Sequence, residues 1–388
     1  MGQEKSGECI SPERLHFVAT PGALERAASG IRDQREIAVD VEADSMFHFQ
    51  EKVCLIQIAT QRTVFIIDPL SCGDLSPLGP VFGDEEIRKI FHGSDFDVRS
   101  LYRDFGIDIR HLFDTELAAR FLGIKESSLE ALLASRFNVR LDKRFQRKDW
   151  SKRPLPEDMI AYAAGDVLHL IPLAHQLETE LESRNRLKWV EEECHHLSRV
   201  RPLNHQEEPL FLSIKGAGRL PPPKLAVLEK LLRFRRKIAE EKDRPLFKVV
   251  SNRALLKVAA DLPQTLEALQ ETNTFSTSQI RMYGKSILEA VNAGLKIPKK
   301  DLPRYPRKSS PRLPAVVPRR VQALKAWRDR QADTLGMDPG LVINKTMIQA
   351  IAMENPCDVK ALDRIPELRL WRKRAFGKAI VDTLKPVL

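Results

Sequence analysis

The pattern of the chain changes near residue 200, and this change limits the folds that the chain can adopt. Before this point, short apolar runs with strand character alternate with segments whose apolar residues recur at helical spacing. After it, almost no strand pattern remains, and the helical segments are separated by proline-rich breaks that a helix cannot cross. We therefore expect one mixed α/β domain followed by an all-helical part.

Strands are predicted at residues 36–43, 53–60, 63–68 and 89–92. Helices are predicted at residues 96–105, stopping at Gly106, and over the long stretch 156–186, with a break at Pro172. Strand pairs thus come first, followed by alternating strands and helices, which is typical of a mixed sheet flanked by helices.

The helical part contains an internal repeat. Pro263 corresponds to Pro356 and Leu269 to Leu362, each 93 positions further along the chain. Such an ordered set of matches indicates a duplicated domain. Between the two copies, residues 298–318 are rich in proline, lysine and arginine, so we expect an extended basic linker that leaves the orientation of the copies open.

The net charge of the chain also differs in sign between its two parts. The 388 residues carry a formal net charge of +10, but residues 1–210 sum to −9 and residues 211–388 to +19. Two domains with differently solvated faces would explain this split. It also fits a front domain whose site needs carboxylates and a back half that holds a polyanion.

Several classes of protein are excluded by what the sequence lacks. The five cysteines are scattered and form no Cys-x-x-Cys pair, which argues against a disulfide scaffold or zinc ribbon and favours a reducing cytoplasm. No apolar run approaches the ~18 residues that span a bilayer, and the first residues are too polar for a signal peptide. Gly284-Lys285-Ser286 lacks the earlier glycine of a phosphate-binding loop, so no nucleotide triphosphate cofactor is expected. We expect a cytoplasmic monomer.

The candidate chemistry begins with two acidic residues in the first of these predicted strands. Asp40 and Glu42 are two positions apart, so their side chains point to the same face of the strand. There they would repel each other unless a cation is bound, although a solvated strand end would also explain them. Further candidates are Asp97, at the start of a predicted helix, and the pair Tyr162 and Asp166, one helical turn apart.

Each candidate has a plain structural explanation when taken alone, since Asp97 suits the helix dipole and Tyr162 suits a core. Together, carboxylates from three separate elements could converge on one pocket. Such a cluster suits Mg²⁺ or Mn²⁺, and two of these ions about 3.5–4 Å apart can promote phosphodiester cleavage. The spacing alone does not say whether the side chains converge.

The order of the motifs resembles a known superfamily. Asp-x-Glu, then His-Gly-x-x-x-Asp, then Tyr-x-x-x-Asp is similar to the three exonuclease motifs of the DEDD superfamily, in its tyrosine-bearing subgroup. Residues 149–155, 113–115 and 215–217 resemble the ribonuclease D family in particular. The basic helical copies resemble two HRDC (helicase and RNase D C-terminal) domains.

This resemblance implies a fold class and domain boundaries. We expect an α/β, ribonuclease H-like exonuclease domain at residues 1–205, with a mixed sheet flanked by helices. Two all-α helical-bundle HRDC domains would follow at residues 218–297 and 319–388, joined by the linker 298–318.

The resemblance also implies a role for each candidate. Asp40 would bridge two divalent ions. Glu42 and Asp166 would complete the first ion site, and Asp97 would support the second. Tyr162 would orient the attacking water. The implied reaction is 3′→5′ hydrolysis of tRNA precursors and other small structured RNAs at their single-stranded 3′ ends, one nucleotide at a time, with release of 5′-monophosphates.

The sequence patterns that suggest contacts to RNA are less specific than the exonuclease motifs. Met46 lies where relatives place a wedge against the terminal bases, and His92 belongs to the second motif. In the helical part, Arg235, Arg236 and Lys237 could grip phosphates.

Two other functions remain compatible with the sequence. A DNA 3′-exonuclease would share all five catalytic candidates, and a non-catalytic nucleic-acid adaptor could use the nuclease fold as a scaffold. His195 and His196 follow the acidic run 191–193 and could suggest a metal site, but this charged helical stretch is interpreted as a solvated face.

Overall fold

The computed structural model describes residues 14–202, 209–306 and 314–387. As far as these residues reach, it divides into two compact units, one from residues 1–43, 53–202 and 311–388 and the other from residues 44–52 and 203–310. The predicted exonuclease domain and the predicted second HRDC domain therefore share one unit. The first 13 residues, and residues 307–313 of the predicted linker, lie outside the described residues.

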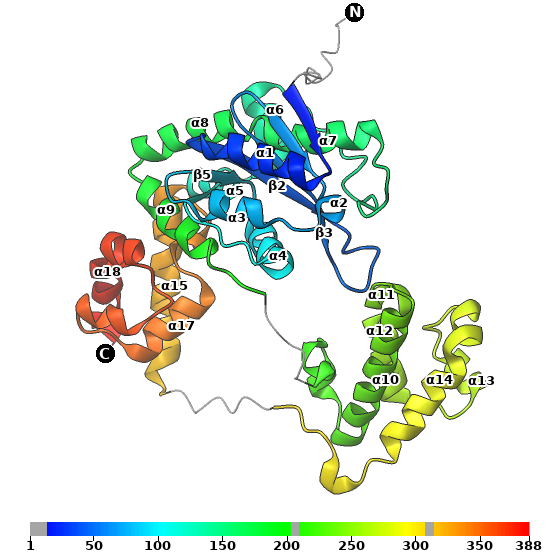
Figure 1. Ribbon diagram of the computed structural model, residues 1–388. Coiled ribbons are helices and arrows are strands. Elements are labelled where there is room, and N and C mark those ends of the chain that lie inside the picture. Colours follow the sequence, from blue (N-terminus) through cyan, green and yellow to red (C-terminus); the bar gives the residue numbers. More distant parts are fainter. Residues whose placement is uncertain (1–13, 203–208, 307–313, 388) are drawn as a thin grey trace, which may run out of the picture. The chain divides into compact units, whose positions relative to one another are not determined.

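The α/β part of the first unit is built on a six-stranded mixed sheet (Figure 1). Its strands are β1 (Leu15–Val18), β2 (Glu36–Ala43), β3 (Val53–Ala59), β4 (Val64–Ile67), β5 (Arg88–Phe91) and β6 (Leu112–Asp114). Their order is β1-β4-β3-β2-β5-β6, with β2 antiparallel to β3 and parallel to β5. The four predicted strands are confirmed to within one residue at each end. The two edge strands, β1 and β6, were not predicted from the sequence.

Helices flank this sheet and position the candidate residues. They are α1 (Pro21–Arg32), α2 (Pro69–Cys72), α3 (Gly79–Gly83), α4 (Asp95–Phe105), α5 (Thr115–Phe121), α6 (Leu129–Phe137), α7 (Glu157–Leu168), α8 (Leu170–Ser183) and α9 (Leu187–Leu197). The predicted end of α4 is confirmed, since Gly106 has a φ of 66° and its N–H donates to carbonyls of the last turn. The long helical stretch is broken at His169 rather than at Pro172, because Pro172 falls in the first turn of α8, where its nitrogen needs no partner. Helix α7 packs across β2, β3 and β4, so its side chains lie over the middle of the sheet.

The rest of the chain forms two copies of one helical pattern. The first copy, in the second unit, contains α10 (Pro222–Glu241), α11 (Leu246–Val249), α12 (Asn252–Asp261), α13 (Leu266–Glu271) and α14 (Thr277–Leu295). The second contains α15 (Val316–Leu335), α16 (Pro339–Val342), α17 (Lys345–Glu354), the 3₁₀ turn η6 (Lys360–Arg364) and α18 (Leu370–Leu384). The elements follow one another in the same order and at matching spacing, which confirms the duplication predicted from the sequence.

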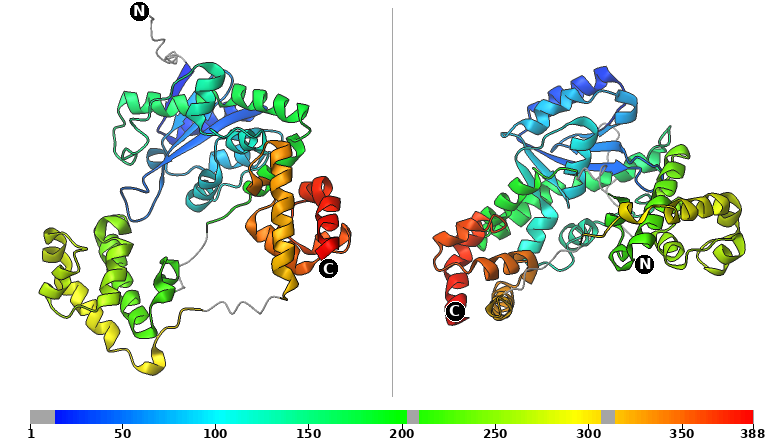
Figure 2. Two further views of the ribbon diagram at one scale, coloured as in Figure 1. Left: turned by 180° about the vertical axis from the view of Figure 1, so that it is seen from behind. Right: turned by 90° about the horizontal axis from the view of Figure 1, so that it is seen from below.

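The second copy packs directly on the α/β domain, through α9 and α18 (Figures 1 and 2). The indole rings of Trp189 on α9 and Trp371 on α18 stack with centroids 4.7 Å apart. Trp371 is 3% exposed, in a core that both domains share. The packing of α9 against α18 therefore places the second copy on the α/β domain.

Two acidic side chains of α9 hold the start of α18. Glu192 accepts the backbone N–H groups of Leu370 and Trp371 at 2.6 and 2.9 Å. Glu193 accepts the indole N–H of Trp371 at 2.8 Å and pairs with Arg372. The expectation of a solvated face at 191–193 is therefore wrong for Glu192 and Glu193, because they meet a helix N-terminus and a buried arginine.

Candidate active site

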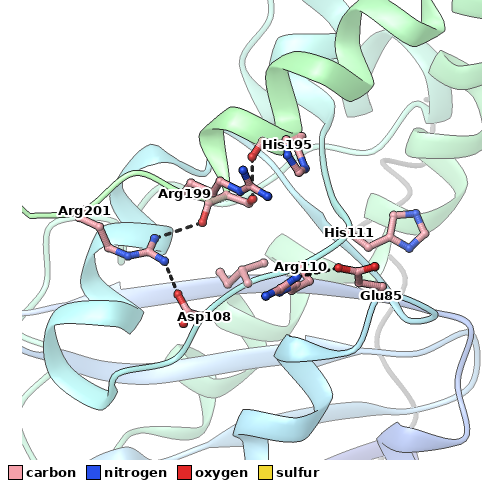
Figure 3. A pocket seen from close by; sticks show the side chains of 9 residues that line it. Glu85, Asp108, Arg110, His111, His195, Arg199 and Arg201 are labelled. Carbon is pink, nitrogen blue, oxygen red and sulfur yellow. Dashed lines mark hydrogen bonds and ion pairs between the residues drawn. The ribbon is translucent and has the colours of Figure 1, made fainter.

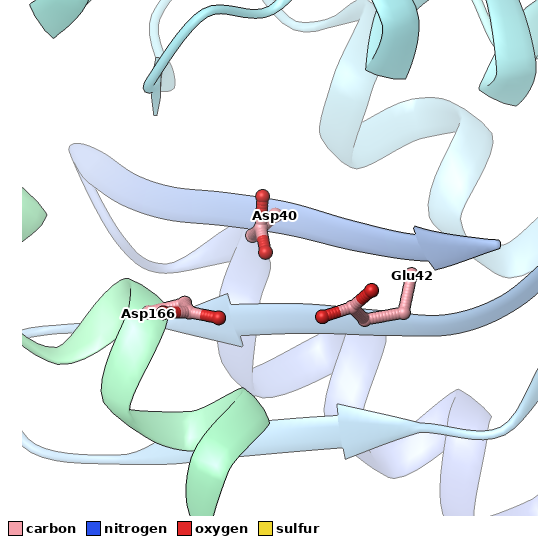
Figure 4. A group of neighbouring side chains, drawn as sticks. All are labelled: Asp40, Glu42 and Asp166. Carbon is pink, nitrogen blue, oxygen red and sulfur yellow. The ribbon is translucent and has the colours of Figure 1, made fainter. Parts of the chain in front are cut away.

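Three carboxylates meet above the centre of the sheet. Asp40 and Glu42 lie on β2, as the two-residue spacing predicts, and Asp166 reaches them from α7 (Figure 4). Ligand oxygens of these three side chains all lie within 4.8 Å of one another. The structure thus brings together three of the four acidic residues that the sequence singled out.

The fourth acidic residue, Asp97, lies in the first turn of α4 and is 6% exposed. It does not belong to the group of three, but its charge helps to raise the pKa of Glu42. Its own pKa is raised well above the usual range, by burial first and then by the charges of Asp40 and Asp114. Asp97 therefore takes part in the same electrostatic cluster.

Burial controls the protonation of the cluster. It raises the pKa of Asp40 to about 7, and burial together with the charge of Asp40 raises that of Asp166 to about 8. Burial and the three other carboxylates raise the pKa of Glu42 to about 10. Since each negative charge is poorly solvated and repels the others, the four groups resist ionising together.

Ion pairs within the described residues do not relieve this repulsion. Within the described part of the chain, no lysine or arginine forms an ion pair with any of the four carboxylates. The donor atoms are carboxylate oxygens only, which is the set that hard divalent ions such as Mg²⁺ and Mn²⁺ prefer. The residues present therefore fit the metal that the sequence predicts, and Asp40, Glu42 and Asp166 are the ones placed to hold it.

Tyr162 stands beside the carboxylates, one turn before Asp166 on α7. Its hydroxyl hydrogen-bonds to the Asp166 carboxylate, and its ring lies against Phe145 and Trp150, with centroids 5.8 and 5.9 Å away. Burial and the nearby carboxylates raise the pKa of Tyr162, so the hydroxyl stays protonated and acts as a donor. Sequence reasoning gave no role to Phe145 or Trp150, although Trp150 lies in the segment 149–155 that carried the family resemblance.

The cluster opens into a cavity of about 500 Å³. Its walls include His92, Lys143 and Gln146 in addition to the acidic residues and Tyr162. The ring of His92 is oriented by a 2.9 Å hydrogen bond between Nδ1 and the Thr115 hydroxyl. The cavity therefore combines acidic groups on its floor with polar and basic groups at its walls.

A larger cavity of about 680 Å³ lies elsewhere in the same unit (Figure 3). Two of its three arginines are already paired, Arg110 with Glu85 at 2.7 Å and Arg201 with Asp108. Its charges are therefore largely balanced by its own ion pairs.

The residues that were predicted to contact RNA differ in how exposed their side chains are. Arg235 is 5% exposed and donates to the carbonyl of Val250 and the side chain of Asn252 at 3.0 and 2.7 Å, so it is corrected to a packing residue of the first repeat. Lys237 is exposed and Arg236 partly exposed on the same helix. Met46 is 47% exposed in the loop 44–52. These three remain candidates, because their side chains can reach a ligand.

Comparisons with known proteins agree with this fold and site. The 3′-5′ exonuclease family profile matches residues 15–182, and the HRDC domain profile matches residues 224–291 and 318–384. Fold and site therefore define a 3′-5′ exonuclease joined to two HRDC domains, as the resemblance implied.

Relatives that match over most of the chain show to which family of 3′-5′ exonucleases it belongs. Ribonuclease D of Gluconacetobacter diazotrophicus is 32% identical over 366 residues, covering 93% of this chain and 90% of that protein. Ribonuclease D of Haemophilus influenzae is 29% identical over 386 residues, covering 97% and 94%. The crystal structure of Escherichia coli RNase D matches with a TM-score of 0.72 and 26% identity, covering 96% and 99%. The chain belongs to the ribonuclease D family and is a 3′-5′ exoribonuclease.

None of the helices in the described residues has the length and apolar character needed to cross a membrane.

Proposed function

We propose that the carboxylate cluster holds two divalent ions, Mg²⁺ or Mn²⁺. Asp40 would contact both ions, Glu42 and Asp166 would complete the first site, and Asp97 would support the second. The observation that carries this proposal is the set of four carboxylates, Asp97 buried and the other three partly buried, that have raised pKa values and form no ion pair with a lysine or arginine of the described residues. A bound pair of cations would remove the repulsion that the fold leaves uncompensated.

When bound, the ions supply an activated water and stabilise the leaving 3′ oxygen. The part of the chain is to orient these reactants. The Tyr162 hydroxyl stays protonated because its pKa is raised, so it would orient the attacking water by a hydrogen bond and would not act as the base. Phe145 and Trp150 hold its ring in place.

The substrate is an RNA 3′ end, and we propose tRNA precursors and other small structured RNAs, cleaved to 5′-monophosphates. A cavity of about 500 Å³ suits one terminal nucleotide, and His92 and Lys143 on its wall provide polar contacts to it. Met46 packs against the terminal bases. The related Escherichia coli enzyme is described as an exoribonuclease involved in structured RNA processing, which supports this substrate class. We further propose a cytoplasmic monomer.

The mechanism is tested with two substitutions at the start of α4. Asp97→Asn removes a charge from the cluster, whereas Asp95→Asn removes an exposed charge that pairs with Arg99 on the same helix. On a 3′-extended tRNA with Mg²⁺, we expect nucleotide release by wild type and by Asp95→Asn, and severe loss for Asp97→Asn. Equal activity of the two variants would overturn the assigned site, and faster cleavage of a matched DNA strand would overturn the substrate class.

The basic helical repeats are proposed to hold the body of the RNA, through residues such as Arg236 and Lys237 on α10. Contacts between basic side chains and phosphates release counterions, so affinity should fall steeply as salt is added. Replacing both residues with alanine should weaken RNA binding and reduce the salt dependence. An unchanged salt dependence would exclude these two residues as phosphate contacts.

A further inference from the structure

One polar side chain lies in the middle of the most buried strand of the sheet. All seven residues of β3 are buried, and six of them are apolar or cysteine. The exception is Gln57, which is fully buried, at 0% exposure. A side chain of this length with two polar atoms is unusual in such a position, because burying an amide is unfavourable unless both atoms are hydrogen-bonded.

Gln57 has no such partners. Neither its Oε1 nor its Nε2 atom has a hydrogen-bond partner in the described residues. In the same domain the Ser100 hydroxyl and the Trp150 indole nitrogen also lack a partner, but each leaves one atom without a hydrogen bond and Gln57 leaves two. Other buried polar groups of the domain are hydrogen-bonded. Asp114, for instance, accepts hydrogen bonds from the backbone of Gly93, Ser94 and Leu117. The amide of Gln57 therefore lowers the stability of the ion-free fold, and an apolar residue of similar size would not.

The strand register places Gln57 beside the metal-binding candidates. It lies directly opposite Asp40 in the antiparallel pair of β2 and β3. Residues paired in this way have side chains on the same face, with Cβ atoms about 4.5–5.5 Å apart. Helix α7, which carries Tyr162 and Asp166, covers this face across β2, β3 and β4. The free amide is thus adjacent to the carboxylate that is proposed to contact both ions.

We propose that Gln57 is a positioning residue of the catalytic site, whose amide N–H groups orient the ionised Asp40 carboxylate. This inference rests on the proposed metal-dependent function. Carboxylates that ligate metals are themselves commonly held by hydrogen bonds from a second layer of residues, and loss of such a bond weakens metal affinity. An amide can donate without adding charge, so it supports Asp40 without competing for the cation.

The test separates metal affinity from stability. Gln57→Met and Gln57→Leu remove the amide and keep an apolar side chain of similar size. Ile66→Met is the matched control, because Ile66 is also fully buried, pairs with Gln57 from β4 and lies on the same face. Mn²⁺ binding to the RNA-free protein is measured by calorimetry, and thermal unfolding is measured in EDTA.

We expect both Gln57 variants to unfold in EDTA at the same temperature as wild type or higher. We expect their Mn²⁺ affinity to fall about 10–100-fold, with kcat reduced and KM for RNA unchanged. Mn²⁺ affinity within twofold of wild type, or an equal loss in Ile66→Met, would overturn the proposal. Absence of Mn²⁺ binding by wild type would instead refute the proposed function, so the two failures are distinguishable.

Discussion

The first unit contains two groups of partly buried carboxylates that differ in whether the protein itself supplies their partners. On α9, Glu192 and Glu193 accept hydrogen bonds from a helix start and an indole, and Glu193 also pairs with Arg372. On β2, Asp40 and Glu42 have no cation of the described chain beside them, and their pKa values are raised. The first group is complete within the protein and joins two domains. The second group is incomplete in this sense, because no ion pair of the described residues compensates its charges, and this fits the divalent ions that we propose it holds.

Asp68 shows that the fold can neutralise a buried acid on the same sheet. Arg153 donates to both of its oxygens at 2.6 Å. Although burial opposes the effect, these hydrogen bonds and one from Ser71 lower the pKa of Asp68. Lack of a partner at Asp40 and Glu42 is thus a local property of the site, and not a general feature of the domain.

The largest expected effect comes from removing a charge of the incomplete group. Asp40→Asn should lower nucleotide release from a 3′-extended tRNA by about 10³-fold or more, because a cation ligand is lost. In EDTA the same variant should unfold at the same urea concentration as wild type or higher, since one repelling charge is gone. Glu36→Gln, on the same strand but paired with His175, is the control and should stay active. An active Asp40→Asn enzyme would contradict the proposed mechanism.

Removing a charge from the complete group should have the opposite result, a loss of stability with little loss of activity. Glu193→Ala leaves Arg372 buried without its carboxylate, and breaking a buried pair from one side costs about 3 kcal/mol of unfolding free energy. Urea unfolding measures this loss, and Glu191→Ala, its exposed neighbour, is the matched control. We expect cleavage by folded Glu193→Ala to remain near that of wild type. Equal stability of the two variants would show that the pair does not hold the domains together.

Tyr162 is the neutral member of the incomplete group, so its loss should matter less than the loss of a carboxylate. Tyr162→Phe keeps the ring against Phe145 and Trp150 and removes only the donor. We expect kcat to fall about 10²-fold with KM unchanged. Tyr102→Phe, at an exposed position, should have no effect. A loss confined to KM would indicate that the hydroxyl binds RNA and does not orient the water.

The smallest effect is the dependence of stability on pH. In the ion-free protein, Asp40 and Asp166 have pKa values raised from 3.8 to about 7 and 8, so the folded state binds protons that the unfolded state has released. The stability from these groups is therefore present below about pH 4 and lost as pH rises to about 8. Asp68, whose pKa is lowered, has the opposite dependence, below its usual pKa of 3.8.

Thermal unfolding in EDTA measures this dependence. We expect the midpoint to fall by several degrees between pH 5 and pH 8. Added Mg²⁺ should abolish the fall, because bound cations favour the ionised carboxylates. Asp40→Asn should reduce it without Mg²⁺. A midpoint that rises over this range in EDTA would contradict the raised pKa values.

Much of the α/β domain was predictable from the sequence, because its central strands and the end of α4 depend on local patterns. Strand β2 matches its prediction from Glu36 to Ala43, and Gly106 ends α4 as expected. The edge strands β1 and β6 escaped prediction, since they are short and are stabilised by pairing with β4 and β5. The prediction that Arg235 contacts RNA was wrong because it, too, relied on the local sequence. Its sequence neighbours are basic, but its own position on α10 faces the core.

For the site, the sequence by itself determined which residue types are present and which share a face. Asp40 and Glu42 share a strand face, and Tyr162 and Asp166 share a helix face, because these spacings follow from strand and helix geometry. Only the tertiary structure decided that α7 lies over β2, so that Asp166 meets residues more than 120 positions earlier in the chain. It also decided that Glu193 meets Arg372. Contacts at such separations depend on how whole elements pack, which no local period encodes.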